Sequence, residues 1–379
     1  MKTEVLDLAK ELIACESITP DDGGCQELIA HRLQRHGFTI EHFPSGEVSN
    51  LWARRNQDSP CLAFAGHTDV VPVGDLMKWD TPPFTPTVNG DMLFGRGACD
   101  MKTGIASMVV AMERFIEKNP NHRGSLGMLI TSDEEGVAID GTRYVMDQLT
   151  ARGEKIDWCL VGEPSSSNVL GDVIRVGRRG TLSGDATIHG SLGHVAFPEL
   201  TPNVLHGTIP VLQKLVDQVW DNGNQNFKPT SFQISNLNVG TGADNVIPGE
   251  LSVQFNFRYN TEQKAESLQN FVIESLNSLK PTFTYELDWR HGGKPFLSQQ
   301  GKLTDFVCQV IYELTQQQPI KSTGGGTSDA RFIVPTGTET VELGHINRTA
   351  HKYNESVRIE DLERLATIYE TILHRMLVA

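Results

Sequence analysis

The feature that most constrains the fold is a change of pattern in the middle of the chain. Over roughly the first 178 residues, short apolar segments alternate with longer segments of helical periodicity. Residues 61–65 form an apolar run followed at once by a turn, as a buried strand does, and residues 102–118 place apolar side chains on one helix face. Strands that alternate with helices predict an α/β architecture with a mostly parallel sheet.

The pattern differs between about 179 and 293. Segments such as 182–189 and 251–259 alternate polar and apolar residues, as half-buried antiparallel strands do, and helical stretches lie between them. The first pattern then returns. We therefore expect a discontinuous domain of residues 1–178 and 294–379, with an α+β domain of residues 179–293 inserted into it.

Composition excludes several classes of protein. The chain has 379 residues, of which 39% are hydrophobic and 21% charged, so it is not a disordered chain. The formal net charge of −14 disfavours nucleic acids and anionic membranes as partners, because both are bound through basic surfaces. We expect no membrane span, since no apolar run is long enough. The six cysteines contain no Cys-x-x-Cys pair and the first residues are too charged for a signal peptide, so we expect reduced thiols and a cytoplasmic location.

Residues suited to chemistry follow the predicted strands directly. His67 and Asp69 come after the strand at 61–65 and point to the same side of an extended segment, so the carboxylate can orient the imidazole. Asp100 stands just before the helix at 102–118. Taken alone, the first pair is a polar turn and Asp100 is a helix N-cap.

A run of three carboxylates, Asp133, Glu134 and Glu135, follows the predicted strand at 125–131. These charges repel one another unless a cation or a proton relieves them. Because adjacent side chains diverge, one glutamate can bind a metal ion while the other acts as a general base. Taken alone, the run is an acidic, solvated loop.

Two more candidates lie further along the chain. Glu163 follows a predicted strand at 157–161, and His351 lies in the returning part of the first domain. Each alone is more often a surface or structural residue. Together with the earlier candidates they make five sites, of which four follow predicted strands or lie in a turn that opens a helix. In a parallel sheet those carboxyl ends share one edge, where ligands bind. Two histidines, one aspartate and two glutamates suit Zn²⁺ or Mn²⁺. Five ligands suit two metals bridged by a carboxylate, and such a site can generate hydroxide and stabilise an oxyanion.

These motifs, in this order and spacing, resemble those of the M20 family of metallopeptidases and amidohydrolases, from about residue 5 to the C-terminus. Longer strings are similar to the branch that acts on N-succinyl-LL-2,6-diaminopimelate: Val161–Ser166, Gly177–Gly180, Asn245–Glu250, Phe255–Arg258 and Gly325–Asp329. The resemblance implies a zinc-aminopeptidase-like catalytic domain with an inserted α+β lid and dimerisation domain. It also implies hydrolysis of that amide to succinate and LL-2,6-diaminopimelate, in lysine and diaminopimelate biosynthesis. A related deacylase, such as one for N-acetylornithine, or an M20 peptidase is the alternative.

The resemblance further implies two Zn²⁺ ions per subunit, with Co²⁺ or Mn²⁺ as substitutes. His67 and Glu163 would bind one ion. Glu135 and His351 would bind the other, and Asp100 would bridge the two.

It also implies roles for residues beside the metals. Asp69 would orient His67, and Glu134 would be the general base that takes a proton from water and then protonates the leaving amine. The peptide bond from Asp100 to Met101 would be cis.

The inserted domain would form a homodimer and supply contacts to a dicarboxylic N-acyl amino acid. His194 and Asn245 would reach a neighbouring subunit's site, where His194 would stabilise the oxyanion. Arg178 and Arg258 would pair with substrate carboxylates. Further implied substrate contacts are Thr181, Gly325, Thr327 and Asn347.

Other interpretations make different demands on the same residues. A non-catalytic metal-binding protein has no use for a free carboxylate such as Glu134 beside its metals. The glycine-rich stretch 324–329 can bind an anion through backbone N–H groups, but it lacks the Gly-Lys-Ser/Thr ending of a nucleotide-binding loop. The sequence departs from the pattern of the resembled branch at Phe197, Gly324, Ala330 and Ala350.

Overall fold

A computed structural model describes residues 3–378. Over these residues the chain divides into two compact units. The first comprises the described residues up to Gly177, Leu297–Ser322 and those from Ser328 onward. The second comprises Arg178–Phe296 and Thr323–Thr327, so it includes a short segment outside the range 179–293 expected from the sequence.

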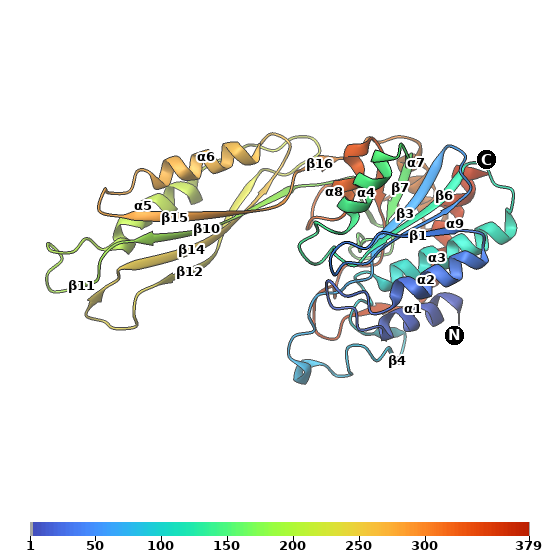
Figure 1. The fold of residues 1–379 in the computed structure, drawn as a ribbon, viewed down its shortest axis with the longest axis horizontal. Helices are drawn as coiled ribbons and strands as arrows, with labels where there is room; N and C mark the ends of the chain where they lie inside the picture. The colour runs from blue at the N-terminus through green and yellow to red at the C-terminus, as the bar shows by residue number, and fades with distance from the viewer. Residues whose placement is uncertain (1–2, 379) are drawn as a thin grey trace. The chain divides into compact units, whose positions relative to one another are not determined.

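The first unit is built on an eight-stranded sheet (Figure 1). Its strands, in spatial order, are β1 (Thr39–His42), β2 (Asn50–Arg55), β6 (Ser125–Thr131), β3 (Cys61–His67), β7 (Trp158–Val161), β18 (Glu339–Glu342), β8 (Val173–Arg175) and β17 (Ile320–Ser322). The four central strands β6, β3, β7 and β18 run parallel to one another. The outer strands β1 and β2 are antiparallel to their neighbours. This is the α/β architecture with a mostly parallel sheet that the sequence predicts.

Helices and short elements complete the first unit. The helices are α1 (Glu4–Ala14), α2 (Cys25–Arg35), α3 (Lys102–Lys118), α4 (Thr142–Ala151), α7 (Lys302–Thr315), α8 (Ala330–Ile333) and α9 (Ile359–Leu377). A small antiparallel sheet joins β4 (Thr87–Asn89), β5 (Met92–Phe94) and β19 (Ser356–Arg358). The remaining short elements of this unit are η1 (Leu76–Lys78) and η2 (Val334–Thr336). Two further short strands, β9 (Gly177–Arg178) and β16 (Phe296–Leu297), each have one residue in either unit.

Helix α3 lies in the middle of the first unit's core. It packs against α1, α9 and β3, and its residues are buried on every side from Lys102 to Met112. A helix that is buried on all sides over most of its length is typical of a core position. It begins directly after Asp100, so the core fixes the position of that side chain.

The second unit is an antiparallel sheet covered by two helices (Figure 1). Its strands, in spatial order, are β12 (Ser231–Val239), β14 (Glu250–Tyr259), β10 (Gly180–His189) and β15 (Thr284–Gly293), with a separate pair β11 (Gly193–His194) and β13 (Val246–Ile247). Every second residue of β10 and β14 is buried, as the alternation in the sequence predicts. These side chains pack with those of α5 (Val204–Asp217) and α6 (Ala265–Leu276) in one apolar cluster.

Within residues 3–378, no helix combines the length and the apolar character needed to cross a membrane.

Candidate metal centre

Three adjacent parallel strands bring polar side chains to one edge of the sheet. β3 ends at His67, β6 is followed by Glu134 and Glu135, and β7 is followed by Glu163. Because β6, β3 and β7 are neighbours and run the same way, their carboxyl ends lie together. The apolar character of these strands buries the sheet and leaves the polar residues at its end.

Asp100 lies between two histidines. Its Oδ1 is 3.3 Å from His67 Nε2, and its Oδ2 is 3.4 Å from His351 Nε2. The Asp100–Met101 peptide bond is cis, as the family resemblance implies. The two carboxylate oxygens of Asp100 therefore face different imidazole rings, as a bridging ligand would require.

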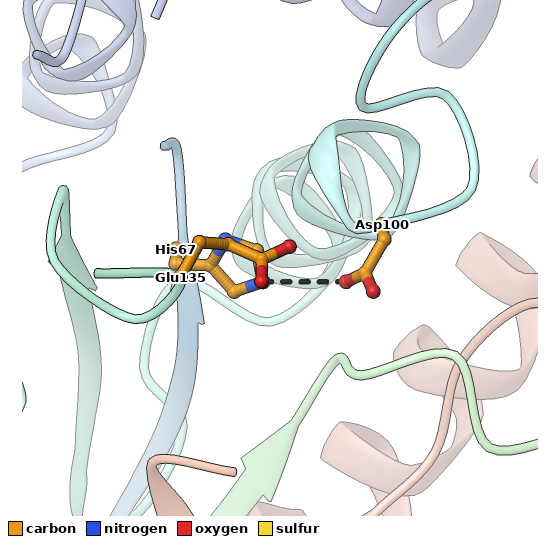
Figure 2. A group of neighbouring side chains, drawn as sticks. All are labelled: His67, Asp100 and Glu135. Atoms are coloured by element: carbon orange, nitrogen blue, oxygen red, sulfur yellow. Dashed lines mark hydrogen bonds and ion pairs between the residues drawn. The ribbon is translucent and has the colours of Figure 1, made fainter. Parts of the chain in front are cut away.

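Two further carboxylates complete the set, one beside each histidine. Glu163 Oε1 lies 3.5 Å from His67 Nε2, and Glu135 Oε1 lies 2.7 Å from His351 Nε2. Ligand atoms of His67, Asp100 and Glu135 all lie within 4.8 Å of one another, and Figure 2 shows these three side chains converging. The structure thus brings together all five residues that the resemblance implies as ligands.

The electrostatics of this cluster call for positive charge. Contacts with Asp100 and Glu135 raise the pKa of His351 to about 10. Burial acts to lower the pKa of His67, but Asp100 and Glu163 outweigh it and raise that pKa well above the usual value. The carboxylates therefore hold protons on both imidazoles when no cation is present.

The residues present fit divalent metal ions. Imidazole nitrogens and carboxylate oxygens are the donors that zinc and manganese prefer. Apart from His351, which is half-exposed, the side chains are largely buried, so their charges are poorly screened by solvent. Cations bound at this edge would replace the protons that the two histidines otherwise carry.

Asp69 links the ring of His67 to the acidic segment after β6. It is fully buried, its Oδ1 is 3.6 Å from His67 Nδ1, and its backbone carbonyl lies 2.8 Å from the same nitrogen. Its two carboxylate oxygens accept hydrogen bonds from the backbone N–H groups of Glu134 (3.2 Å) and Glu135 (3.0 Å). Asp69 therefore fixes the backbone of both glutamates as well as facing the histidine.

Glu134 lies among the candidate metal ligands. Its carboxylate, with atoms of His67 and Glu163, forms a second group within 4.8 Å. Burial and the negative charges of Glu163 and Asp329 raise its pKa well above the usual value. Its Oε1 is also 3.8 Å from Arg331 Nη1, with both side chains almost buried. The geometry suits a proton acceptor and also suits a metal ligand.

The structure places His194 and Asn245 side by side in the second unit. His194 ends β11, which pairs with β13 at Val246, and the backbone N–H of Val195 donates to the Asn245 carbonyl (3.2 Å). Both residues are exposed. Nδ1 of His194 accepts from the N–H of Ala196 (3.0 Å), which orients the ring.

Arg258 and Thr181 lie directly opposite each other on β14 and β10. Residues paired in this way have their side chains on the same face of the sheet. Burial lowers the pKa of Arg258, and the nearby charge of Arg179 adds to this effect. The cost of burying this guanidinium favours a carboxylate partner.

Arg178 lies against the glycine-rich stretch. Its Nη1 donates to the carbonyl oxygens of Gly324 and Gly326, each at 3.2 Å. Gly325 has φ +92° and a Cβ there would lie 2.5 Å from the same nitrogen, so only glycine fits. Of the other expected contacts, Thr327 is half-buried, and Asn347 is exposed with its N–H donating to the Ser166 carbonyl (2.9 Å).

Three charged residues with buried side chains lie near the centre and were not expected there from the sequence. Arg331 contacts Glu134, Asp329 accepts from the Thr142 hydroxyl (2.6 Å) with a pKa raised by burial to about 6, and Glu355 contacts the segment that carries Asp100. Asp329 and Arg331 lie in or beside the string Gly325–Asp329, and Glu355 lies four residues after His351. Polar and apolar residues are mixed around them in the sequence, so no local pattern distinguishes them.

Comparison with known proteins agrees with this geometry. The sequence profile described as peptidase family M20/M25/M40 matches residues 63–375. The chain belongs to this family. Among M20 relatives, the succinyl-diaminopimelate desuccinylase of Alkalilimnicola ehrlichii is 52% identical over 375 residues, covering 99% of this chain and 100% of that protein. The enzyme of the same name from Shewanella pealeana is 52% identical over 376 residues, covering 99% and 98%.

Solved structures share the fold. An M20 family metallo-carboxypeptidase from Sulfolobus solfataricus superposes with a TM-score of 0.83 at 17% identity, covering 98% of this chain and 99% of that one. Human carnosine dipeptidase 1 superposes with a TM-score of 0.74 at 16% identity, covering 98% and 95%. The predicted fold class is confirmed, and the chain is an M20 metallohydrolase with candidate metal-binding histidines and carboxylates.

Proposed function

We propose that this chain hydrolyses N-succinyl-LL-2,6-diaminopimelate to succinate and LL-2,6-diaminopimelate. The observation that carries this function is the 52% identity, over the full length, to succinyl-diaminopimelate desuccinylases. The clustered histidines and carboxylates supply the chemistry that such a reaction requires. The enzyme thus serves lysine and diaminopimelate biosynthesis.

We assign the metals as two Zn²⁺ ions per subunit, held by Asp100 and the four ligand residues around it. Bound cations would activate water for attack and polarise the amide carbonyl. Glu134 accepts the proton of the attacking water at its carboxylate and returns it to the leaving amine nitrogen. Asp69 keeps His67 and the Glu134 backbone in place during this transfer.

The substrate carries carboxylates that need fixed positive charge. Arg178 and Arg258 are the side chains we assign to them, because a planar guanidinium pairs with a carboxylate through two parallel hydrogen bonds. The partly buried Arg258, beside Arg179, is the better placed to gain from such a partner. Thr181, Gly325, Thr327 and Asn347 are assigned as further contacts.

The decisive experiment is an add-back titration. Metal-stripped protein receives zinc from zero to two equivalents, and hydrolysis of N-succinyl-LL-2,6-diaminopimelate is followed at each step, with N-acetylornithine as the competing substrate. Activity should rise with zinc and favour the succinyl substrate. A preference for N-acetylornithine would overturn the substrate assignment, and activity that ignores zinc would overturn the metal assignment.

We further propose a homodimer formed by the second unit. β12 is an edge strand of its sheet, and Leu237 and Val239 at its end are exposed. An unpaired edge with apolar side chains favours pairing with another strand. In this dimer His194 and Asn245 serve the neighbouring subunit's site, with His194 stabilising the oxyanion.

Mixing two inactive variants tests this arrangement. Glu134→Gln and His194→Ala subunits, unfolded and refolded together in equal amounts, form heterodimers in which one site has both intact residues. Random pairing should recover about one quarter of wild-type activity. No recovery, with dimers present by light scattering, would place His194 in its own subunit's chemistry.

We place the enzyme in the cytoplasm. All six cysteines are free thiols, which a reducing compartment maintains. Fractionation of the source cells with antibody detection tests this, and recovery in an extracytoplasmic fraction would contradict it.

A further inference from the structure

Glu355 has a fully buried carboxylate with four hydrogen bonds. Its Oε2 accepts from Arg96 Nη1 (2.7 Å) and from the backbone N–H of Gly97 (3.1 Å). Its Oε1 accepts from the backbone N–H groups of Cys99 (2.8 Å) and Asp100 (2.9 Å). One side chain therefore holds most of the turn that ends at the central carboxylate of the metal site.

The same residue lies at the end of the segment that carries His351. The backbone carbonyl of Glu355 accepts the N–H of Gly95 (3.0 Å). The segment from 351 to 355 and the segment from 95 to 100 are far apart in the sequence, and Glu355 joins them through both its backbone and its side chain. Asp100 and His351, whose side chains meet at 3.4 Å, come from these two segments.

The backbone around His351 needs such support. His351 has φ +63° and Asn354 has φ +56°, in the left-handed region that residues with a Cβ rarely adopt. Such conformations persist where the surroundings fix them. Here Asn354 exchanges hydrogen bonds with Asp80 (2.8 and 2.9 Å). The residue directly after Asn354 is Glu355, which is anchored by the four hydrogen bonds of its own carboxylate.

We propose that Glu355 is a positioning residue for the second metal site. It sets the place of Asp100 relative to His351, so that the Asp100 carboxylate can face both imidazoles at once. The inference deepens the proposed function and rests on its metal centre. Removing the carboxylate should weaken metal binding at the Asp100, Glu135 and His351 site while leaving the substrate contacts of the second unit unchanged.

The competing explanation is that the buried Arg96–Glu355 pair serves stability alone. The chain offers a matched control in Glu339, another nearly buried carboxylate. Glu339 accepts the backbone N–H groups of Gly301 (2.7 Å), Leu303 (3.1 Å) and Thr304 (2.9 Å) at the start of α7. Replacing Glu339 removes a comparable set of hydrogen bonds away from the metal ligands.

The test compares Glu355→Gln with Glu339→Gln in the full chain. Metal-free protein is titrated with Co²⁺ while its visible absorption is followed, and unfolding by urea is measured in parallel. We expect Glu355→Gln to bind the second Co²⁺ about 10- to 100-fold more weakly, as loss of a ligand's support typically does. Glu339→Gln should lose stability but keep the wild-type Co²⁺ titration.

Other outcomes also decide. Two Co²⁺ bound by Glu355→Gln with wild-type affinity would overturn the proposal. If that variant does not fold, Glu355→Asp keeps the charge but shortens its reach, and a wild-type Co²⁺ titration there would overturn it equally. If wild-type protein binds two Co²⁺ but does not cleave N-succinyl-LL-2,6-diaminopimelate, the proposed function fails while the Co²⁺ comparison still tests Glu355.

Discussion

Replacing Glu134 with glutamine separates the two roles that the geometry allows this side chain. Glutamine has nearly the same shape as glutamate and can still lie beside Arg331, whose Nη1 is 3.8 Å from Oε1 of Glu134. It cannot take a proton from water, and it is a poor metal ligand. Because Glu134 lies within 4.8 Å of ligand atoms of His67 and Glu163, the substitution tests both its role as a base and its role as a ligand.

The expected result is loss of turnover with retention of metal. Removing a general base lowers kcat by about 10²- to 10⁴-fold, or roughly 3–5 kcal/mol in the barrier. KM should change little, because Glu134 acts on the water and the leaving amine rather than on the substrate carboxylates. Zinc stoichiometry, measured by elemental analysis after dialysis, should stay at two per subunit.

Glu135→Gln is the matched comparison, since the two residues are adjacent and Asp69 holds both backbones. The Glu135 variant should lose affinity for one zinc ion because Glu135 faces His351 at 2.7 Å. If Glu134→Gln binds only one zinc, Glu134 is a ligand. If it keeps most of its kcat, Glu134 is not the base, and the reasoning is refuted.

Three further predictions concern Asp69, the two histidines of the metal centre and the buried His345. Asp69→Asn leaves one of two backbone N–H groups without an acceptor, so zinc affinity by chelator competition should fall about 10- to 100-fold, and unchanged affinity would contradict the positioning role. Carboxylates raise the pKa of His67 and bring that of His351 to about 10. Zinc binding near neutral pH should therefore release protons and become tighter as the pH rises. Calorimetry in buffers of different ionisation enthalpy measures this release, and a result of no release would contradict the prediction. His345 is buried, and burial lowers its pKa to about 4 against a smaller opposing effect of the Thr103 backbone. The unfolded chain takes up a proton at His345 near pH 6.5 while the folded chain does not, so the free energy of unfolding declines as the pH falls from 6.5 towards 4. His345→Leu should remove up to about 3 kcal/mol of that decline, measured by urea unfolding at a series of pH values. Parallel pH profiles for the variant and the wild type would refute this.

The parts of the fold with local signals could be predicted from the sequence. The expected helix at 102–118 and strand at 125–131 match α3 and β6 residue for residue, because apolar residues recur at helical spacing in the first and form a short continuous run in the second. The strand β15 was missed, although Tyr285, Leu287 and Trp289 alternate with polar residues in the pattern of a half-exposed strand.

The strand β18 could not be predicted in this way. Its sequence, Glu-Thr-Val-Glu, has too few apolar residues for a buried strand, yet all four are buried. Glu339 is accommodated by backbone N–H groups at the start of α7, and Glu342 accepts the Ser328 hydroxyl. Both partners come from other segments of the chain, so no local sequence pattern predicts them.

The same distinction holds at the metal centre. His67, Glu135 and Glu163 could be placed together because each follows a recognisable strand. Arg331 and Glu355 act through contacts with Glu134 and Asp100, which lie far away in the sequence. Their positions depend on how the chain returns to the sheet, and that return is visible only in three dimensions.

The order of strands in the large sheet has a consequence for synthesis on the ribosome. β18 fills the place between β7 and β8, but β7 ends at Val161 and β18 begins only at Glu339. At about 5–20 residues per second, translation needs roughly 10–35 s to cover that interval. During this time the whole of Arg178–Phe296 emerges and can form its own sheet, while the edge of β7 that later pairs with β18 has no partner strand. The nascent chain therefore passes through a state in which the inserted unit is complete and the sheet that bears the metal ligands is not.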